Sequence, residues 1–306
     1  MPRRSIRAGA LVAMAAAAAM PRLREKLGVP RFAALTAVSL GPPSVAIVLR
    51  RGRRRSYAVF LAQMWAYLRA FELTYARPER LRRRLRVDYL IRADRMLGMG
   101  RPPGVRLQAW RARSGRAETL DRVFGSVYFA WALERHAALL TILGRDPEAF
   151  PRAAVLVAAA FDVGWVIYSA LPSAPPWWAA KHGHIDGLHR VTVEASRSLP
   201  LVPAENEEDS DQGNPWASMP STHTASAAMV ALVLAELDPR LGIAAALYAC
   251  ALGFSLVYLG EHYAVDVLAG LALALAIRAA EPPARPVARR IASALESLGS
   301  SAPARS

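Results

Sequence analysis

Long apolar segments constrain this chain more than any other feature of its sequence. Each has about the 20 residues that an α-helix needs to cross a hydrocarbon core of about 30 Å. Because a backbone in lipid must satisfy its own hydrogen bonds, such segments favour helices. We therefore predict an all-α, polytopic membrane helical bundle with about six transmembrane helices. The candidate segments cover roughly residues 32–49, 56–75, 124–144, 153–172, 216–237, 241–260 and 262–280.

The first of these segments is the weakest candidate, because Gly41, Pro42 and Pro43 interrupt it. Such an interruption fits either a kinked span or a re-entrant hairpin. Residues 1–31, which precede it, hold two basic patches around an alanine-rich run. That pattern fits a signal-like segment or an interfacial helix.

The charge of the chain points to lipid rather than to nucleic acid. Hydrophobic residues make up 54% of the 306, yet the formal net charge is +15, a combination typical of membrane proteins. The Lys and Arg residues lie in short runs that flank the apolar segments instead of covering one soluble face. Contact with lipid headgroups is favoured, and no nucleic-acid partner is predicted. The single cysteine, Cys250, excludes an intrachain disulfide and a cysteine metal cage.

Four regions follow from this pattern. A basic N-terminal segment occupies 1–31. Residues 32–123 hold the N-terminal membrane segments and an Arg-rich stretch whose helical periodicity predicts an interfacial amphipathic helix. A membrane helical domain follows over 124–280, and a disordered tail rich in Pro, Ala, Ser and Arg is predicted for 281–306. The loop over 173–214 has no apolar periodicity either and is predicted to be disordered or solvated.

One histidine stands at the start of an apolar segment, in ASMPSTHTAS. Ser218 or Ser221 can cap this helix, and the small residues after the cap leave backbone N–H groups at a positive helix end. We expect an anion site there, with Ser221 and Thr222 as phosphate-binding residues. His223 lies in the same turn, where it can pass a proton to or from an ester oxygen. The alternative is an interfacial histidine that only caps the helix.

A second polar site occurs in YLGEHYAVDVLAG, where His262 and Asp266 stand four residues apart. Residues at that spacing share one face of a helix and can hydrogen-bond. A carboxylate that accepts the proton of one ring nitrogen leaves the lone pair of the other nitrogen free to attack phosphorus. Ionisable groups in membrane segments usually mark function, and these fall on the same membrane face as His223. A polar pair that only packs helices is the alternative.

Together, PSTH at 220–223 and Ser255 followed by His262 and Asp266 resemble the second and third signature motifs of the type 2 phosphatidic acid phosphatase superfamily. The resemblance implies that His262 is the phosphorus nucleophile and that Asp266 orients it. It also implies that His223 protonates the leaving group, without a metal or another cofactor. Residues 124–280 would then be the catalytic domain.

Two departures from the family pattern concern phosphate binding. Leu256 stands where the third motif has arginine, and the first motif is absent. PSAPPWW at 172–178 stands in its place, which is similar to the inositol phosphorylceramide synthase branch, whose members move a phospho-headgroup to an acceptor alcohol. Another cation must therefore replace the arginine, and Lys181, Arg190 and Arg197 are candidates, with Arg190 the first choice. Headgroup contact is the alternative role for each.

The sequence thus predicts an integral membrane phosphatase or phosphotransferase that acts on a lipid-linked phosphate ester through a phosphohistidine. The substrate would be a phospholipid or a polyprenyl phosphate. The alternatives are an inositol phosphate type headgroup transferase with little hydrolysis, a catalytically silent lipid-binding protein, and a proton-relaying transporter. The loop histidines have a spacing that permits zinc, but no cysteine assists them, so no metal is predicted; they are His182, His184 and His189.

The basic residues also bear on membrane orientation. They favour a cytoplasmic active site if all seven segments span, and they are nearly balanced if the first is re-entrant. The family resemblance implies an extracytoplasmic site, and we adopt a multi-pass plasma-membrane protein with that orientation. The sequence leaves the lipid, the acceptor and the oligomeric state open.

Overall fold

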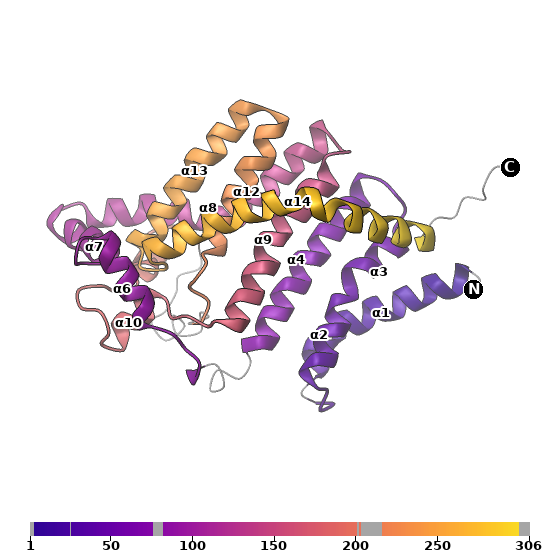
Figure 1. Ribbon diagram of the computed structural model, residues 1–306, viewed down its shortest axis with the longest axis horizontal. Helices are drawn as coiled ribbons and strands as arrows, with labels where there is room; N and C mark the ends of the chain where they lie inside the picture. Colours follow the sequence, from indigo (N-terminus) through magenta and orange to yellow (C-terminus); the bar gives the residue numbers. More distant parts are fainter. Residues whose placement is uncertain (1–2, 25, 76–81, 201, 203–215, 300–306) are drawn as a thin grey trace. The chain divides into compact units, whose positions relative to one another are not determined.

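The computed structural model describes residues 3–24, 26–75, 82–200, 202 and 216–299 (Figure 1). These residues are largely helical, and the β contacts among them are isolated bridges that join Ser173 to Arg86 and to Ala217. The prediction of an all-α fold is therefore confirmed. The chain divides into two compact units, residues 1–76 with 147–158 and 279–306, and residues 77–146 with 159–278.

Four helical segments in the described part of the chain are long and apolar enough to cross a membrane. They are Ser5–Leu23, Arg31–Val48, Phe150–Ala170 and Pro239–Tyr258. Their length and composition support an integral membrane protein. The count of about six spans stays a prediction.

In the first unit, the segment interrupted by glycine and proline forms two helices, α2 (Arg31–Ser39) and α3 (Gly41–Val48). Leu40 between them keeps helical backbone angles, φ −77° and ψ −12°. Prolines are tolerated at the start of α3 because the first N–H groups of a helix have no partner within it. The geometry favours the kinked span over the re-entrant hairpin. The same unit contains α1 (Arg3–Leu23) and α4 (Arg53–Tyr75).

The last helix, α14 (Ala264–Gly299), continues well beyond the point where the sequence favoured a disordered tail over 281–306. The end of this segment is rich in Ala, Leu, Glu and Arg, which have high helix propensity. Glu281 also accepts hydrogen bonds from Arg152 and from Arg285. Residues 300–306 lie outside the described residues.

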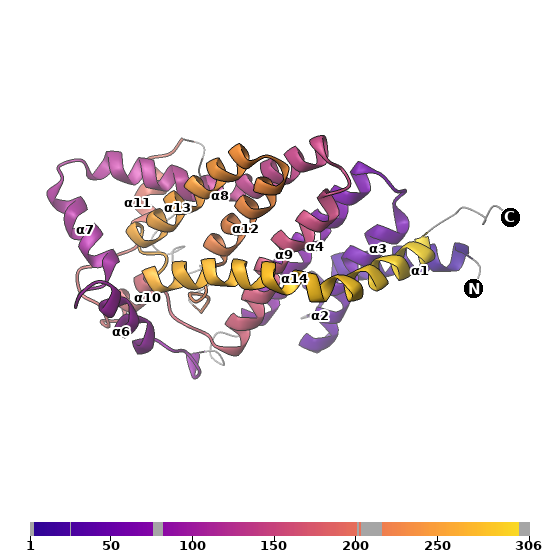
Figure 2. The same cartoon turned by 45° about the horizontal axis from the view of Figure 1, so that its top comes forward.

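In the second unit, two helices form a hairpin around Asp238, whose side chain caps the second of them by accepting the Arg240 N–H (2.9 Å). They are α12 (Thr222–Leu237) and α13 (Pro239–Tyr258), which lie side by side in Figures 1 and 2. Both pack against α8 (Ala117–Arg145). The first residues of α14 and the last of α9 (Phe150–Ala170) belong to the same unit.

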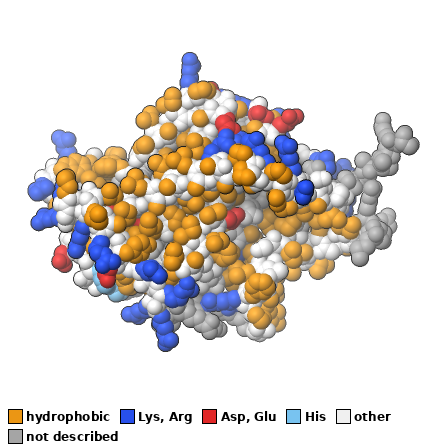
Figure 3. All heavy atoms as spheres, in the orientation of Figure 1, with side chains coloured by type: hydrophobic (Ala, Val, Ile, Leu, Met, Phe, Trp, Pro, Cys, Tyr) orange, Lys and Arg blue, Asp and Glu red, His pale blue; other side chains and the backbone are white. Residues whose placement is uncertain are grey.

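The Arg-rich stretch forms two short helices, α6 (Asp88–Leu97) and α7 (Pro103–Arg113), instead of the single amphipathic helix that the sequence predicts. The break has a physical cause, because Met99 and Gly100 adopt positive φ angles of 51° and 96°, which end a helix. Lys and Arg side chains gather over α6 and α7 on the face shown in Figure 3. The predicted position at the membrane surface stays a prediction.

The described part of the loop after α9, residues 173–200, is partly buried within the second unit, which the prediction of a disordered or solvated loop missed. It contains two short helices, α10 (Pro176–Lys181) and α11 (Thr192–Arg197), and buries Trp177 and Val191. The apolar residues of this proline-containing segment follow no regular period, which is why a periodicity argument misses their burial. The acidic insert ENEEDSD, 205–211, lies outside the described residues.

Candidate active site

The first turn of α12 begins at Ser221, which caps the helix. Its hydroxyl oxygen accepts the Thr224 N–H (3.2 Å), so Ser221 rather than Ser218 is the capping residue. The Thr222 N–H donates to the hydroxyl of Tyr168 (3.2 Å). Two of the N–H groups that were expected to face an anion therefore already have protein partners.

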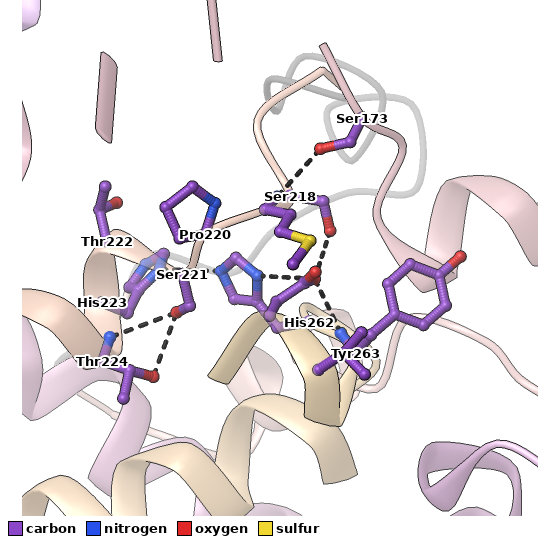
Figure 4. A network of polar contacts seen from close by, with 12 residues as sticks. Ser173, Ser218, Pro220, Ser221, Thr222, His223, Thr224, His262 and Tyr263 are labelled. Atoms are coloured by element: carbon purple, nitrogen blue, oxygen red, sulfur yellow. Dashed lines mark hydrogen bonds and ion pairs between the residues drawn. The ribbon is translucent and has the colours of Figure 1, made fainter. Parts of the chain in front are cut away.

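His223 and His262 face each other in this unit (Figure 4). The Nδ1 of His223 and the Nε2 of His262 are 3.2 Å apart, which is hydrogen-bond distance, so one ring donates and the other accepts. The rings meet edge to face, with centroids 5.3 Å apart. The structure thus brings together two histidines that lie 39 positions apart in the chain.

The other ring nitrogen of His262 contacts a buried carboxylate. Its Nδ1 lies 3.3 Å from the Oδ2 of Asp266, which has no exposed surface. The same oxygen accepts the Ser218 hydroxyl (2.6 Å) and the Tyr263 N–H (3.0 Å) (Figure 4). Because these donors fix the carboxylate, it can hold the imidazole with Nε2 directed at His223. No local sequence pattern predicts the contact between Ser218 and Asp266, which lie 48 positions apart.

Aromatic side chains from α8 surround His223. The Trp131 ring lies 4.2 Å from the His223 ring and the Tyr128 ring 5.7 Å from it, centroid to centroid. Trp131 is fixed in turn, because its Nε1–H donates to the Ser226 hydroxyl (2.9 Å). The guanidinium of Arg135 lies over the Trp131 ring at 4.7 Å. Spacings of three and four residues on α8 were the sequence signal that could have identified this face.

Two glycines allow neighbouring helices to approach the first turn of α12. A Cβ on Gly270 of α14 would lie 2.3 Å from the Ser221 carbonyl oxygen, and one on Gly164 of α9 would lie 2.2 Å from the Cγ2 of Thr222. Such small residues let helices pack closely in membranes. At this contact the Ser221 N–H donates to the Asp266 carbonyl (3.0 Å). This hydrogen bond joins the PSTH motif at the start of α12 to the motif that contains His262 and Asp266.

We expect Gly270→Ala to separate these motifs, because the new methyl group would collide with backbone rather than with a flexible side chain. The cost should be about 1–3 kcal/mol of unfolding free energy, with a larger loss of activity. Thermal unfolding in detergent and turnover of lipid phosphates measure the two effects. Gly144→Ala on α8, where a Cβ meets nothing within 4 Å, is the control. Wild-type stability and turnover in Gly270→Ala would contradict the argument.

The loop before His262 also depends on a glycine. Gly260 has φ +78°, and a Cβ there would lie 2.6 Å from the His189 carbonyl oxygen. Its own carbonyl accepts the Trp177 N–H (3.1 Å). Gln108 of α7 donates to the carbonyls of His189 (2.9 Å) and Tyr258 (3.0 Å). The residues that lead into His262 are therefore held by α7 and by the segment around α10.

Arg190 contacts Glu261, the residue before His262. Its Nε donates to Glu261 (2.7 Å), and its guanidinium lies 4.8 Å from the ring centre of Trp177. Thr192 also donates to Glu261, the residue that precedes His262. Lys181 ends α10 with an exposed side chain. Arg197 ends α11 and is exposed as well, so Arg190 is the one of the three candidate cations that contacts the residue before His262.

The loop histidines do not form a metal-ligating group in the described part of the chain. His182 stacks on Trp178 with ring centroids 3.7 Å apart, and His184 lies 3.7 Å from Asp88. His189 lies 3.4 Å from Glu194. Burial alone would raise the pKa of Glu194, but the hydrogen bond from His189 holds it below its ordinary value. No group of three metal-ligating side chains occurs in the described part of the chain, and metal independence stays a prediction.

A family model and two known proteins match this chain. A family model described as the PAP2 superfamily matches residues 88–280. Inositol phosphorylceramide synthase of Candida albicans is 30% identical over 125 residues, which cover 38% of this chain and 26% of that protein. The catalytic subunit of the Saccharomyces cerevisiae inositol phosphorylceramide synthase is 28% identical over 124 residues, 37% of this chain and 30% of that protein.

The chain therefore matches less than a third of the length of these relatives. No solved structure matches it significantly. The family match begins at the start of α6, so it also includes residues 88–123, which precede the predicted catalytic domain of 124–280.

Proposed function

The chain belongs to the PAP2 superfamily, and on that premise we propose that it is a membrane enzyme that cleaves or transfers a lipid-linked phosphate through a phosphohistidine. The observation that carries the proposal is the 3.2 Å contact between the Nδ1 of His223 and the Nε2 of His262. Asp266 stands behind His262 in the position of an orienting carboxylate. The first turn of α12, the loop before α14 and the first turn of α14 thus bring together a proton donor, a nucleophile and its orienting group.

In the first half-reaction, the Nε2 lone pair of His262 attacks phosphorus, and the bond from phosphorus to the leaving alcohol oxygen breaks. His223 donates its proton to that oxygen as the bond breaks. Asp266 accepts the Nδ1–H and stabilises the positive charge on the phosphorylated ring. Phosphorus must enter between the two ring nitrogens, so their 3.2 Å contact has to open when substrate binds.

In the second half-reaction, His223 takes a proton from the attacking oxygen, and the bond between phosphorus and nitrogen breaks. Water as the attacking group makes the enzyme a phosphatase, and an alcohol makes it a phosphotransferase. The named relatives favour transfer as the second candidate function, with an inositol phosphate headgroup moved to an acceptor alcohol. The buried Leu256 and the PSAPPWW segment, which depart from the phosphatase motifs, favour the same candidate.

Phosphoryl transfer also requires positive charge or N–H donors at the phosphoryl oxygens. Arg190 fills that role in this proposal by exchanging part of its contact with Glu261 for phosphate. In this proposal Ser221 and Thr222 bind the phosphate at the start of α12, where it has to displace the present partners of their N–H groups, the Asp266 carbonyl and the Tyr168 hydroxyl, and Lys181 contributes from the loop. The reaction needs no metal, and the site faces the extracytoplasmic side of the plasma membrane.

Radiolabelled lipids test the proposal directly. The purified protein is incubated in EDTA with labelled phosphatidic acid, polyprenyl diphosphate or phosphatidylinositol, each with and without an alcohol acceptor. We expect an acid-labile phosphoenzyme, together with inorganic phosphate for hydrolysis or a new labelled lipid for transfer. No adduct and no turnover with any of these lipids would remove the proposal, and inhibition by EDTA would contradict metal independence.

A further inference from the structure

Helix α14 begins directly after Tyr263, and Asp266 is the third residue of its first turn. The first N–H groups of a helix have no partner inside it. Asp266 accepts the Tyr263 N–H (3.0 Å), which is one half of a capping box. The other half normally comes from the residue before the helix, whose side chain accepts the N–H of the second or third helical residue. Tyr263 cannot do this, because its hydroxyl lies beyond the ring.

Asp94 of α6 makes the missing contact from elsewhere in the chain. Its Oδ1 accepts the N–H of Val265, the second residue of α14, at 3.2 Å. Asp94 is only 1% exposed and shares the buried stripe of α6 with Leu90 and Ile91. Those two side chains belong to the apolar cluster around Tyr263. A carboxylate therefore occupies a place in α6 where helical periodicity predicts an apolar residue.

The charge at this position is unfavourable without its hydrogen bonds. Burial raises the pKa of Asp94 to about 6, together with a smaller contribution from the charge of Asp266 and against the opposing hydrogen bonds from the N–H groups of Val265 and Ala264. A buried polar group costs stability unless it is hydrogen-bonded, so its presence is best explained by the contact with α14.

We propose that Asp94 is a positioning residue for Asp266 and His262, the catalytic pair of the proposed function. By capping α14 from α6, it fixes the helical turn from which Asp266 reaches His262. Leu90 and Ile91 hold α6 by packing, so a change at Asp94 should alter the cap without releasing the helix. The effect on activity rests on the function proposed above, whereas the effect on the helix end does not.

Three variants separate capping from packing and from charge. Asp94→Asn keeps an acceptor oxygen, as asparagine caps helices about as well as aspartate. Asp94→Leu keeps a similar volume in the apolar cluster but removes the acceptor. Asp88→Asn, in the same helix but exposed, controls for the loss of a carboxylate. Hydrogen–deuterium exchange of peptides covering 262–268 reports the cap, and kcat and KM report the catalytic pair.

We expect exchange in Asp94→Leu to be about fivefold faster over 262–268. Its kcat should be about 10- to 100-fold lower with KM nearly unchanged, because a small displacement of Asp266 misaligns the nucleophile without touching the bound lipid. Asp94→Asn and Asp88→Asn should both resemble the wild type. If Asp94→Leu does not fold, Asp94→Ala replaces it.

Wild-type exchange and kcat in the leucine variant would overturn the proposal, since packing alone would then explain the residue. Equal losses in the asparagine and leucine variants would overturn it too, because the charge rather than the acceptor would matter. If the wild type turns over no lipid phosphate, the proposed function fails. The exchange measurement still decides whether Asp94 caps α14.

Discussion

Replacing His262 with asparagine should abolish the phosphoenzyme and lower lipid-phosphate turnover by about 10⁴-fold or more. Asparagine can keep a hydrogen bond to Asp266, in place of the Nδ1 contact of 3.3 Å, but it has no nitrogen lone pair to attack phosphorus. The fold should therefore survive while the chemistry is lost. Trapping of an acid-labile adduct from radiolabelled lipid phosphate, with phosphate release in parallel, measures both.

His184→Asn provides the matched control, because that histidine is exposed in the loop and contacts Asp88 rather than the catalytic pair. It should form the adduct at the wild-type rate. An acid-labile adduct that persists in His262→Asn would assign the nucleophile to another residue. Loss of folding in His262→Asn is excluded by comparing its thermal unfolding with that of the wild type.

The pairing of the histidines was accessible from the sequence because its causes are local. His262 and Asp266 stand four residues apart, and Pro220 with Ser221 marks the start of a helix that carries His223 in its first turn. The prediction that His262 and Asp266 share a helix face is wrong, because α14 begins at Ala264 and His262 lies in the loop before it. One intervening helix, α13, returns the chain to the same end. These features predict which residues share an end of the bundle, but they do not predict the distance between two rings.

The rest of the site depends on which helix packs beside which, and no local pattern reports that. Trp131 stands beside His223 only because α8 packs along α12. Ser218 reaches Asp266 only because Gly270 lets α14 approach the start of α12. The same reason applies to Asp94, whose partner Val265 is 171 positions away. Non-local contacts of this kind appear in the sequence only as single residues out of pattern, such as a carboxylate in an apolar stripe.

Proline residues and helix caps explain why the observed helix boundaries differ from those that the sequence predicts. The apolar run beginning near 216 predicts a span from that residue, but α12 starts at Thr222, because Pro220 and Ser221 set the first helical turn there. The loop over 173–200 packs without a period because Pro172, Pro175 and Pro176 keep it from forming a long helix. Hydrophobic periodicity therefore located the long helices better than it located the polar and proline-containing segments that complete the site.

His223→Asn should separate the two half-reactions. With a natural lipid ester, turnover should fall by about 10²- to 10⁴-fold, because the alkoxide leaves without a proton donor. An aryl phosphate such as p-nitrophenyl phosphate needs no donor, since nitrophenolate is a good leaving group. His262 should then be phosphorylated, but no base would activate water to release it. We expect a burst of about one nitrophenol per enzyme, followed by an adduct that does not turn over.

The nitrophenol burst distinguishes a proton donor from a residue that only shapes the site. In His262→Asn there should be no burst, and in His184→Asn there should be steady turnover. If His223 served only to pack against Trp131, its ring centroid being 4.2 Å away, then His223→Asn would slow both substrates equally and would accumulate no adduct. That outcome would leave the 3.2 Å contact with His262 as a structural hydrogen bond and would remove His223 from the proposed reaction.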